Sequence, residues 1–290
     1  MHFGNGILNS SEITVRADTL FSALFIEALK SGKAEKLYNA VTTGSLRISD
    51  AFPYDHDEYY IPKPVIRIEA GDTGNSLEKK FYKGLKYLPV QKLSDYLSGK
   101  MDMEDRVKTF AGVSTRTMAN VRREEDSLPY QVGVCSFEEG TGLYVLTKTE
   151  NEDEMNLFDD LIRALSVVGI GGKRSAGLGK FSVNIREVEP AFLKCFDTEK
   201  GIKMLLSVAL PKEEEMTAAM DGASFNVIQR AGFVASEMYS YDQKKHTLYA
   251  FESGSCFNNT FEGDIYNVSR GSGHPVYRYA RPFFMSITGE

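Results

Sequence analysis

Apolar residues recur at helical spacing in two stretches of the chain. In the first, Leu20, Leu24 and Ala28 lie on one face, which predicts an amphipathic helix. Gly32 follows this stretch and favours the end of the helix, because glycine readily adopts the left-handed conformation of a helix stop. Asp18 stands at its start, where we expect the carboxylate to act as the N-cap.

The second helical stretch covers residues 151–169. Leu157, Leu161, Leu165 and Val168 form one apolar stripe, which we expect to be buried. The acidic residues before the stripe suit the positive end of the helix dipole. The sequence therefore predicts a second amphipathic helix that ends at a glycine.

Alternating apolar and polar residues predict strands elsewhere. Residues 129–137 and 143–149 alternate around a short loop that contains glycine, which predicts a β-hairpin. Residues 180–188 alternate in the same way after the second helix and predict another strand. Residues 50–68 are rich in proline and aromatic residues and predict an irregular, ordered connection that ends in a strand. With the first helix, the predicted order is an α-ββαβ series that lacks one initial strand.

The rest of the pattern divides the chain. Residues 71–126 are the most polar part and predict an insertion that is partly helical, with a mobile or partner-facing tip. From residue 202 onward, short alternating runs and one short helix predict a smaller, β-rich half. The segment 187–200 is the predicted boundary, so we expect two domains, 1–195 and 196–290.

Composition and charge narrow the class of protein. The 290 residues are 42% hydrophobic and 26% charged, which is typical of a globular protein with a sizeable core, and no run of about 18 apolar residues predicts a membrane span. Cys135, Cys195 and Cys256 form no CxxC pair, which indicates reduced thiols, a cytoplasmic location and no cysteine zinc site. The net charge of −6 argues against a protein coated in nucleic acid, though not against a local basic groove.

A glycine-rich loop is the strongest chemical signal in the chain. Residues 169–181 read GIGGKRSAGLGKF, and five glycines beside basic side chains are typical of a phosphate-binding loop. A Walker-type loop requires glycine at position 167 and Ser or Thr at position 174, where this chain has Val167 and Arg174. A dinucleotide-binding fingerprint requires glycine at position 174. The loop therefore matches neither nucleotide motif.

The direction of the chain also argues against a nucleotide. Nucleotide loops run from a strand into a helix, so that the helix N-terminus faces the phosphate. This loop follows a helix, whose C-terminus repels phosphate. Glycine N–H groups with Lys173 and Arg174 fit an extended nucleic-acid backbone better. The alternative is an ordinary glycine helix stop joined to a basic turn.

Several motifs together resemble a known family. The helix followed by GIGGKRSAGLGKF and a strand resembles the G-rich loop of the RAMP superfamily of CRISPR RNA-binding proteins. The segments HFGNGILNSSEITVRADTLFSAL, DAFPYDHDEYYIPKP, FESGSCFNNTFEGDIYNV and HPVYRYARPFF resemble the fourth subunit of the type III-A (Csm) effector complexes, a Cas-five-like subunit. The resemblance covers nearly the whole chain. One departure is that only Met1 precedes the HFG motif, where the family has a β-strand.

The resemblance implies a fold and a function. The fold is α+β, with two ferredoxin-like (RRM-like) RAMP domains facing each other across a cleft and an inserted thumb-like segment. The function is that of a non-catalytic subunit that binds and caps the crRNA 5′ handle in antiviral defence. The implied partners are the crRNA, the large polymerase-like CRISPR subunit, a backbone RAMP subunit and target RNA near the thumb. No metal ion or cofactor is implied.

The resemblance also implies the RNA-binding residues of the N-terminal half. The G-rich loop would support the handle backbone through its main chain, with charge from its basic residues, by Gly169, Gly171, Gly172, Lys173, Arg174, Ser175, Ala176 and Gly177. The neighbouring start of the chain and of the first helix would contribute His2, Phe3, Gly4, Asp18, Thr19 and Ser22. For Asp18, the role of helix cap is favoured over that of ligand.

Two further groups of RNA-binding residues are implied. The thumb candidate, residues 114–126, would contribute Arg116, Met118, Asn120, Arg122 and Arg123, with a solvated charged loop as the alternative. The C-terminal half would contribute Ser255, Phe257, His274, Tyr277 and Arg278. The alternative for this second group is a half-buried strand, in which tyrosines also alternate.

Two other classes of function stay open. One is a metal-independent endoribonuclease that processes precursor crRNA, as a sibling branch of the superfamily does with a histidine. Of the four histidines only His2 stands in a suitable place for a general base, and a packed or RNA-contacting imidazole is the favoured interpretation. The other is a structural assembly subunit that never contacts RNA, which the acidic net charge allows.

Overall fold

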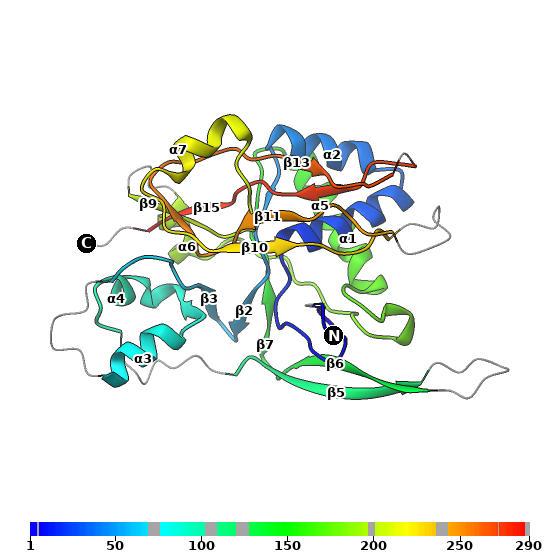
Figure 1. The fold of residues 1–290 in the computed structure, drawn as a ribbon, viewed down its shortest axis with the longest axis horizontal. Helices are drawn as coiled ribbons and strands as arrows, with labels where there is room; N and C mark the ends of the chain where they lie inside the picture. Colours follow the sequence, from blue (N-terminus) through cyan, green and yellow to red (C-terminus); the bar gives the residue numbers. More distant parts are fainter. Residues whose placement is uncertain are drawn as a thin grey trace.

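The chain folds into helices and several small antiparallel sheets (Figure 1). The structure is a computed structural model that describes residues 1–4, 6–68, 76–101, 109–119, 128–196, 201–235, 243–271 and 273–287. Asn120, Arg122 and Arg123 of the thumb candidate lie outside these residues. Within the described part of the chain, no helix is long and apolar enough to cross a membrane. The α+β class predicted from the sequence is confirmed.

The described residues form α-helices and short 3₁₀ turns. The α-helices are α1 (Ala17–Lys30), α2 (Ala34–Thr43), α3 (Ser76–Gly84), α4 (Leu93–Leu97), α5 (Glu152–Val168), α6 (Pro190–Phe196) and α7 (Met216–Met220). The 3₁₀ turns are η1 (Val90–Lys92), η2 (Arg174–Ala176) and η3 (Glu213–Glu215). Both helices predicted from apolar spacing are therefore present, as α1 and α5.

The C-terminal end of α1 is as predicted, whereas its N-cap is a different residue from the one expected. Gly32 has φ +69°, and the next amide, Lys33 N–H, donates to Ala28 O at 2.8 Å, so the predicted glycine stop is confirmed. The N-cap, however, is Arg16, which makes no side-chain capping bond. The prediction that Asp18 caps the helix is wrong, because its carboxylate is turned inward to two arginines.

Helix α5 follows its predicted pattern except at its last turn. The side chain of Asn151 accepts a hydrogen bond from Asp153 N–H at 2.9 Å and caps the first turn. Leu157, Leu161 and Leu165 are buried as expected. Val168 is 38% exposed, so the expected burial of this last residue of the stripe is wrong. The apolar face of α5 ends one turn before the glycine-rich loop.

The strands are short and all their pairings are antiparallel. In the N-terminal part they are β1 (Arg47–Ile48), β2 (Phe52–Asp55), β3 (Glu58–Pro62), β4 (Tyr87–Pro89), β5 (Ala111–Ala119), β6 (Pro129–Phe137), β7 (Thr141–Tyr144) and β8 (Thr147–Lys148). In the C-terminal part they are β9 (Ile202–Leu205), β10 (Val227–Arg230), β11 (Leu248–Phe251), β12 (Cys256–Phe257), β13 (Ile265–Asn267), β14 (Tyr277–Tyr279) and β15 (Phe284–Ile287). The sheets have the orders β4-β3-β2-β7, β12-β9-β15, β1-β8, β5-β6, β10-β11 and β13-β14.

The predicted hairpin between residues 129–137 and 143–149 is wrong. Strand β6 pairs instead with β5, which lies in the polar insertion, over the full register from Ala111↔Phe137 to Ala119↔Pro129. Strand β7 pairs with β2, which lies far earlier in the chain. Alternation marks a strand but does not name its partner, so both strands were recognised and their neighbours were not.

Two other segments differ from their predicted structure. Within residues 50–68, β2 and β3 form a hairpin with Tyr54↔Tyr59 in register, and the residues after Pro62 form no strand. Residues 180–188 also form no strand, although exposure alternates along residues 180–184. A strand requires hydrogen bonds to a neighbour, which the apolar pattern alone does not supply.

The main hydrophobic core is built from both ends of the sequence. Leu20, Leu24 and Leu161 from α1 and α5 share this core with Val208 and Tyr279 from the C-terminal part. At the predicted boundary, α6 buries Phe192 in a second core that joins the β2–β3 hairpin to the sheet of β9 and β15. The division into domains 1–195 and 196–290 stays a prediction.

Two parts project from the same side of this body (Figure 1). Helices α3 and α4 form a lobe at the lower left, and β5 and β6 form a long two-stranded ribbon along the bottom. The start of the chain lies above the ribbon, close to β6. This arrangement gives the molecule one face framed by two extensions.

Candidate nucleic-acid interface

The glycine-rich loop is closed at its base by its own backbone. Ile170 N–H donates to Gly179 O at 2.9 Å, directly after the end of α5. Gly169 and Gly179 both have φ +92°. A Cβ atom at Gly179 would lie 2.3 Å from Ile170 O, and one at Gly169 would lie 2.8 Å from the carbonyl carbon of Gly179. Only glycine fits both positions, so these two residues shape the loop rather than bind a ligand.

The loop rests on the start of the chain. Gly172 N–H donates to His2 O at 2.9 Å, and a Cβ atom at Gly171 would lie 2.4 Å from that same oxygen. The His2 ring fills the space beside Gly172, and its Nδ1 lies 2.7 Å from Gly133 O of β6. His2 is 7% exposed, so its imidazole joins the loop to β6 by packing.

The tip of the loop is exposed and carries the basic side chains. Lys173 adopts the left-handed conformation, with φ +59°, and begins the short turn η2. Its Nζ lies 3.1 Å from the hydroxyl of Tyr130 and 4.5 Å from the centre of the Tyr130 ring, which ties the loop to the ribbon. Ser175, Ala176 and Gly177 are exposed, and Arg174 is half-buried. Tyr130 was not among the predicted site residues, because nothing in its sequence context distinguishes it from other strand tyrosines.

The first turn of α1 holds a buried ion-pair cluster. Asp18 accepts hydrogen bonds from Arg230 Nε at 2.9 Å and Nη2 at 2.7 Å, and it is also paired with Arg278 Nη1. Burial alone would raise the pKa of Asp18, but the two guanidinium groups hold the pKa below its ordinary value. The structure therefore places Asp18 and Arg278 as partners of each other, not as phosphate ligands. Arg230 was missed, because only tertiary packing brings it beside Asp18.

The hydroxyl groups near this cluster are engaged within the protein. Thr19 is exposed, and its Oγ1 accepts from Arg230 Nη2 at 2.9 Å. Ser22 Oγ donates to Asp18 O at 2.9 Å, one helical turn earlier. Thr19 is thus the residue of the first turn of α1 that combines exposure with a cationic neighbour.

The chain is similar to known proteins over nearly its full length. Residues 198–287 match the family model described as the CRISPR Csm4 C-terminal domain. A protein of Mycobacterium tuberculosis (strain ATCC 25618 / H37Rv), named CRISPR system Cms protein Csm4, is 36% identical over 293 residues, which cover 99% of this chain and 94% of that protein. The chain belongs to the Csm4 family of type III-A CRISPR subunits. The protein of the same name from Streptococcus thermophilus is 30% identical and covers 99% of this chain and 95% of its own length.

Solved structures of the Csm4 family share the fold of this member. A Csm4 chain from the "Csm3-Csm4 subcomplex in the type III-A CRISPR-Cas interference complex" matches with a TM-score of 0.67 and 17% identity, over 97% of this chain and 98% of the other. A chain from the "Csm1-Csm4 cassette in complex with pppApA" matches with a TM-score of 0.63 and 22% identity, over 96% of this chain and 93% of the other. The resemblance that the motifs indicated is confirmed.

Several RNA-binding residues expected for this Csm4-family chain lie in its interior. Phe3 and Phe257 are core residues, and Ser255 is fully buried, with its Oγ accepting from Asn226 N–H at 3.2 Å. Buried aromatic rings offer no exposed face for stacking on a base. Gly4 is exposed beside the His2 ring. Periodicity could not distinguish buried residues from RNA-contacting residues, because both kinds recur at every second position of a strand.

The remaining expected residues are half-buried or exposed. Tyr277 packs against Phe25 and Tyr38, with ring centres 5.7 Å and 4.5 Å away. His274 is half-buried near the same strand. On the ribbon, Arg116 is exposed on β5, and Met118 is half-buried opposite Tyr130. The structure thus brings together the loop tip, His2, Gly4 and strand β6 of the ribbon. Of the C-terminal group, Arg278 lies instead beside Asp18.

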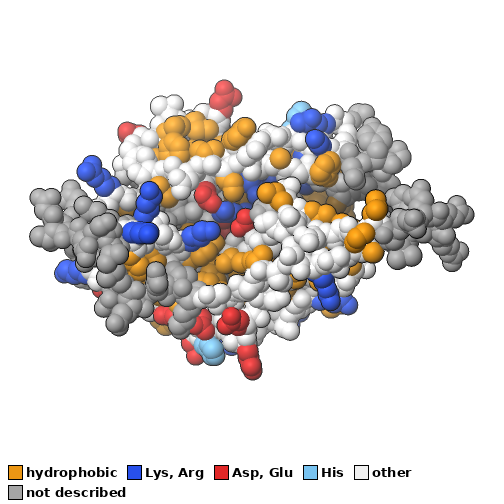
Figure 2. All heavy atoms as spheres, turned by 60° about the horizontal axis from the view of Figure 1, so that its bottom comes forward, with side chains coloured by type: hydrophobic (Ala, Val, Ile, Leu, Met, Phe, Trp, Pro, Cys, Tyr) orange, Lys and Arg blue, Asp and Glu red, His pale blue; other side chains and the backbone are white. Residues whose placement is uncertain are grey.

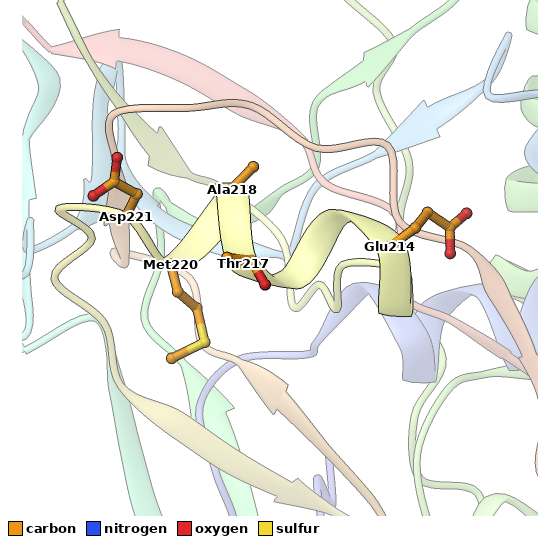
Figure 3. Close-up of a pocket in the computed structure, with 5 residues that line it drawn as sticks. All are labelled: Glu214, Thr217, Ala218, Met220 and Asp221. Carbon is orange, nitrogen blue, oxygen red and sulfur yellow. The ribbon is translucent and has the colours of Figure 1, made fainter.

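A shallow pocket on α7 is acidic, unlike the basic tip of the glycine-rich loop. It is lined by Glu214, Thr217, Ala218, Met220 and Asp221 (Figure 3). Its two charged side chains are both acidic, so it repels phosphate. Among the residues that the structure describes, no group of three or more His, Cys, Asp or Glu side chains could hold a metal ion.

Proposed function

We propose that this Csm4-family chain binds the 5′ handle of the crRNA in a type III-A effector complex. In the same proposal it joins a Csm3-type backbone subunit to a Csm1-type large subunit, with target RNA passing near the ribbon of β5 and β6. The support for the partners is that relatives were solved as a Csm3-Csm4 subcomplex and as a Csm1-Csm4 cassette. A related type III-B Cmr complex was solved bound to cognate target RNA.

The observation that carries the proposal is the construction of the glycine-rich loop. Its base is rigid, because Gly179 O and His2 O each accept an amide from the loop. The loop follows the C-terminus of α5, so the N-terminus of an α-helix does not face a ligand there, and Ser175, Ala176 and Gly177 at its tip are exposed. Backbone N–H groups at the tip, with the charge of Arg174 and Lys173, suit the phosphates of an extended strand.

We propose no catalytic role for the subunit. The histidine best placed for acid–base chemistry, His2, has its Nδ1 held by Gly133 O and its ring packed under the loop. His56 is exposed and pairs with Asp55, its neighbour in sequence. A general base must reach a substrate proton, and a buried, engaged imidazole is poorly suited to that task. Cleavage of a labelled repeat RNA without metal, abolished by His2→Ala, would instead establish the endoribonuclease alternative.

The two-domain organisation is part of the proposal. The family model begins at residue 198, close to the predicted division after residue 195. Two ferredoxin-like halves with an inserted thumb are compatible with the α+β fold. Because Val208 and Tyr279 pack in the same core as α1 and α5, we expect both halves to unfold in one transition.

The loop is tested in the assembled complex. The variant Lys173→Ala with Arg174→Ala removes both charges of the tip, and the matched control, Lys36→Ala with Arg163→Ala, removes two charges from exposed helix positions. A charged hydrogen bond contributes about 1.5–3 kcal/mol, so we expect crRNA affinity to fall roughly tenfold or more. Equal crRNA retention in variant and control would remove the loop from the proposed interface. A melting curve of each variant separates lost binding from lost folding.

A further inference from the structure

An inserted lobe of the chain carries a concentration of positive charge. We call residues 63–68 and 76–101, which include α3, β4 and α4, the lysine lobe. Residues 63–101 contain eight Lys or Arg and four Asp or Glu, whereas the whole chain has a net charge of −6. The lobe is therefore a local basic region on an acidic protein.

Five basic side chains of the lysine lobe are exposed, whereas Lys92 is half-buried and pairs with Asp95 at 3.6 Å. Within the described residues, no carboxylate lies in ion-pair distance of any of Arg67, Lys80, Lys83, Lys86 and Lys100, and all five are exposed.

Elsewhere several basic residues are neutralised by ion pairs within the protein. Arg16 pairs with Asp50 and Glu252, and Lys33 pairs with Asp160 at 2.8 Å. The surplus charge of the lobe thus remains directed at solvent.

Three lysines converge at the end of α3. Lys63 N–H donates to Lys86 O at 2.9 Å, which places these two residues side by side. Lys63 Nζ donates to Tyr82 O at 3.1 Å and to Lys83 O at 3.4 Å, so Lys63 satisfies the C-terminal carbonyl groups of the helix. Lys80 and Lys83 lie three residues apart on one face of α3. Lys80, Lys83 and Lys86 are therefore exposed near one another at this end of α3, around the structural Lys63, and we call these three residues the row.

The composition of the lobe favours a nucleic-acid backbone over a protein surface. Among its described residues, no large hydrophobic side chain is exposed. Protein interfaces are enriched in aromatic residues, methionine and arginine and depleted in lysine. Lysine is suited to phosphates, which it meets as a point charge with three donors.

The position of the lobe favours the same RNA that the loop is proposed to hold. The lobe and the ribbon project from one side of the body, and the start of the chain lies above the ribbon, close to β6 (Figure 1). Viewed from that side, Lys and Arg side chains gather at the left of the face, over the lobe (Figure 2). The start of the chain, whose His2 O accepts the amide of Gly172 from the glycine-rich loop, therefore lies on the same side of the body as the ribbon (Figure 1).

We propose that the row Lys80, Lys83 and Lys86 binds the phosphate backbone of the crRNA as a contact separate from the glycine-rich loop. The inference rests on the proposed function and extends it to a second surface. These lysines would bind phosphates electrostatically and would not recognise bases, because they carry charge but no aromatic ring that could stack on a base.

The test uses the assembled complex with bound crRNA. The variant Lys80→Glu, Lys83→Glu and Lys86→Glu reverses the row, and the control Lys36→Glu, Lys148→Glu and Arg163→Glu makes the same charge change at exposed positions elsewhere. Losing three phosphate contacts to a single strand reduces the slope of log affinity against log salt by about 2. We expect this reduction in the lobe variant and not in the control. In the wild-type complex, ultraviolet crosslinking with mass spectrometry is expected to recover RNA on the peptide containing residues 80–86.

The outcomes separate this inference from the proposed function. If the lobe variant matches the control and residues 80–86 carry no crosslink, the inference is overturned, while a loop variant that still loses crRNA leaves the proposed function intact. Loss of a neighbouring protein subunit with an unchanged salt slope would show that the row docks a protein. Crosslinks that form only after target RNA is added would overturn the assignment to crRNA. A Lys→Gln triple variant guards against misfolding, because it removes charge without adding acids.

Discussion

The buried Asp18 cluster makes the sharpest quantitative prediction about this protein. Asp18 is 1% exposed, and it neutralises Arg230 and Arg278, whose side chains are 20% and 7% exposed. Asp18→Asn keeps the shape of the side chain but leaves two arginines facing a neutral group. Breaking a buried ion pair by removing one partner costs about 3–5 kcal/mol, because the other charge stays buried without compensation. If Asp18 were only a helix cap, the cost would be about 1 kcal/mol.

The assay is thermal unfolding of the chain beside a matched control. Glu262→Gln removes an acid that also pairs with two arginines, Arg47 and Arg281, but that is 59% exposed. An exposed pair contributes about 0–1 kcal/mol. We expect Asp18→Asn to lower the melting temperature by roughly 10 °C and Glu262→Gln by no more than about 2 °C. Equal shifts in the two variants would refute the argument that burial makes the Asp18 cluster indispensable.

Two other predictions follow from the loop and from the same carboxylate. Gly171 and Gly177 have φ +90° and +82°, so alanine at either costs about 1 kcal/mol of backbone strain, but at Gly171 the new Cβ also meets His2 O at 2.4 Å. Gly171→Ala should therefore lower the melting temperature more than Gly177→Ala. The difference corresponds to about 1 kcal/mol of folding free energy, because Gly171→Ala also breaks the hydrogen bond between Gly172 N–H and His2 O. Equal shifts in the two variants would contradict this packing. Because the folded pKa of Asp18 lies below its ordinary value, its stabilisation is present above the unfolded pKa and is lost as pH falls through the folded pKa. The melting-temperature difference between wild type and Asp18→Asn should shrink in acid, and a constant difference from pH 7 to pH 3 would refute this linkage.

The local features of the fold could be predicted from the sequence. The apolar stripes of α1 and α5 and the stop at Gly32 depend on neighbours within one or two turns, so periodicity and residue type suffice to find them. The glycine-rich loop could be separated from nucleotide loops because Arg174 and the preceding helix are local facts. The family resemblance was visible for a similar reason, since its motifs are short and continuous.

Positions of side chains were less predictable than positions of elements. Phe257 and Tyr277 both lie in predicted strands, yet one is fully buried and the other packs at a half-buried surface. Tyr130, which holds Lys173, and Arg230, which pairs with Asp18, had no distinguishing signal in their own segments. Each acquires its role from a residue distant in sequence.

The sequence by itself determined helices α1 and α5, the presence of several strands, the family and the chemical character of the glycine-rich loop. Only the tertiary structure decided that β6 pairs with β5, that Asp18 faces two arginines, and that the lysine lobe lies on the same side as the ribbon. The physical reason is that periodicity records whether a side chain is buried, whereas partners are chosen by the free energy of bringing distant segments together.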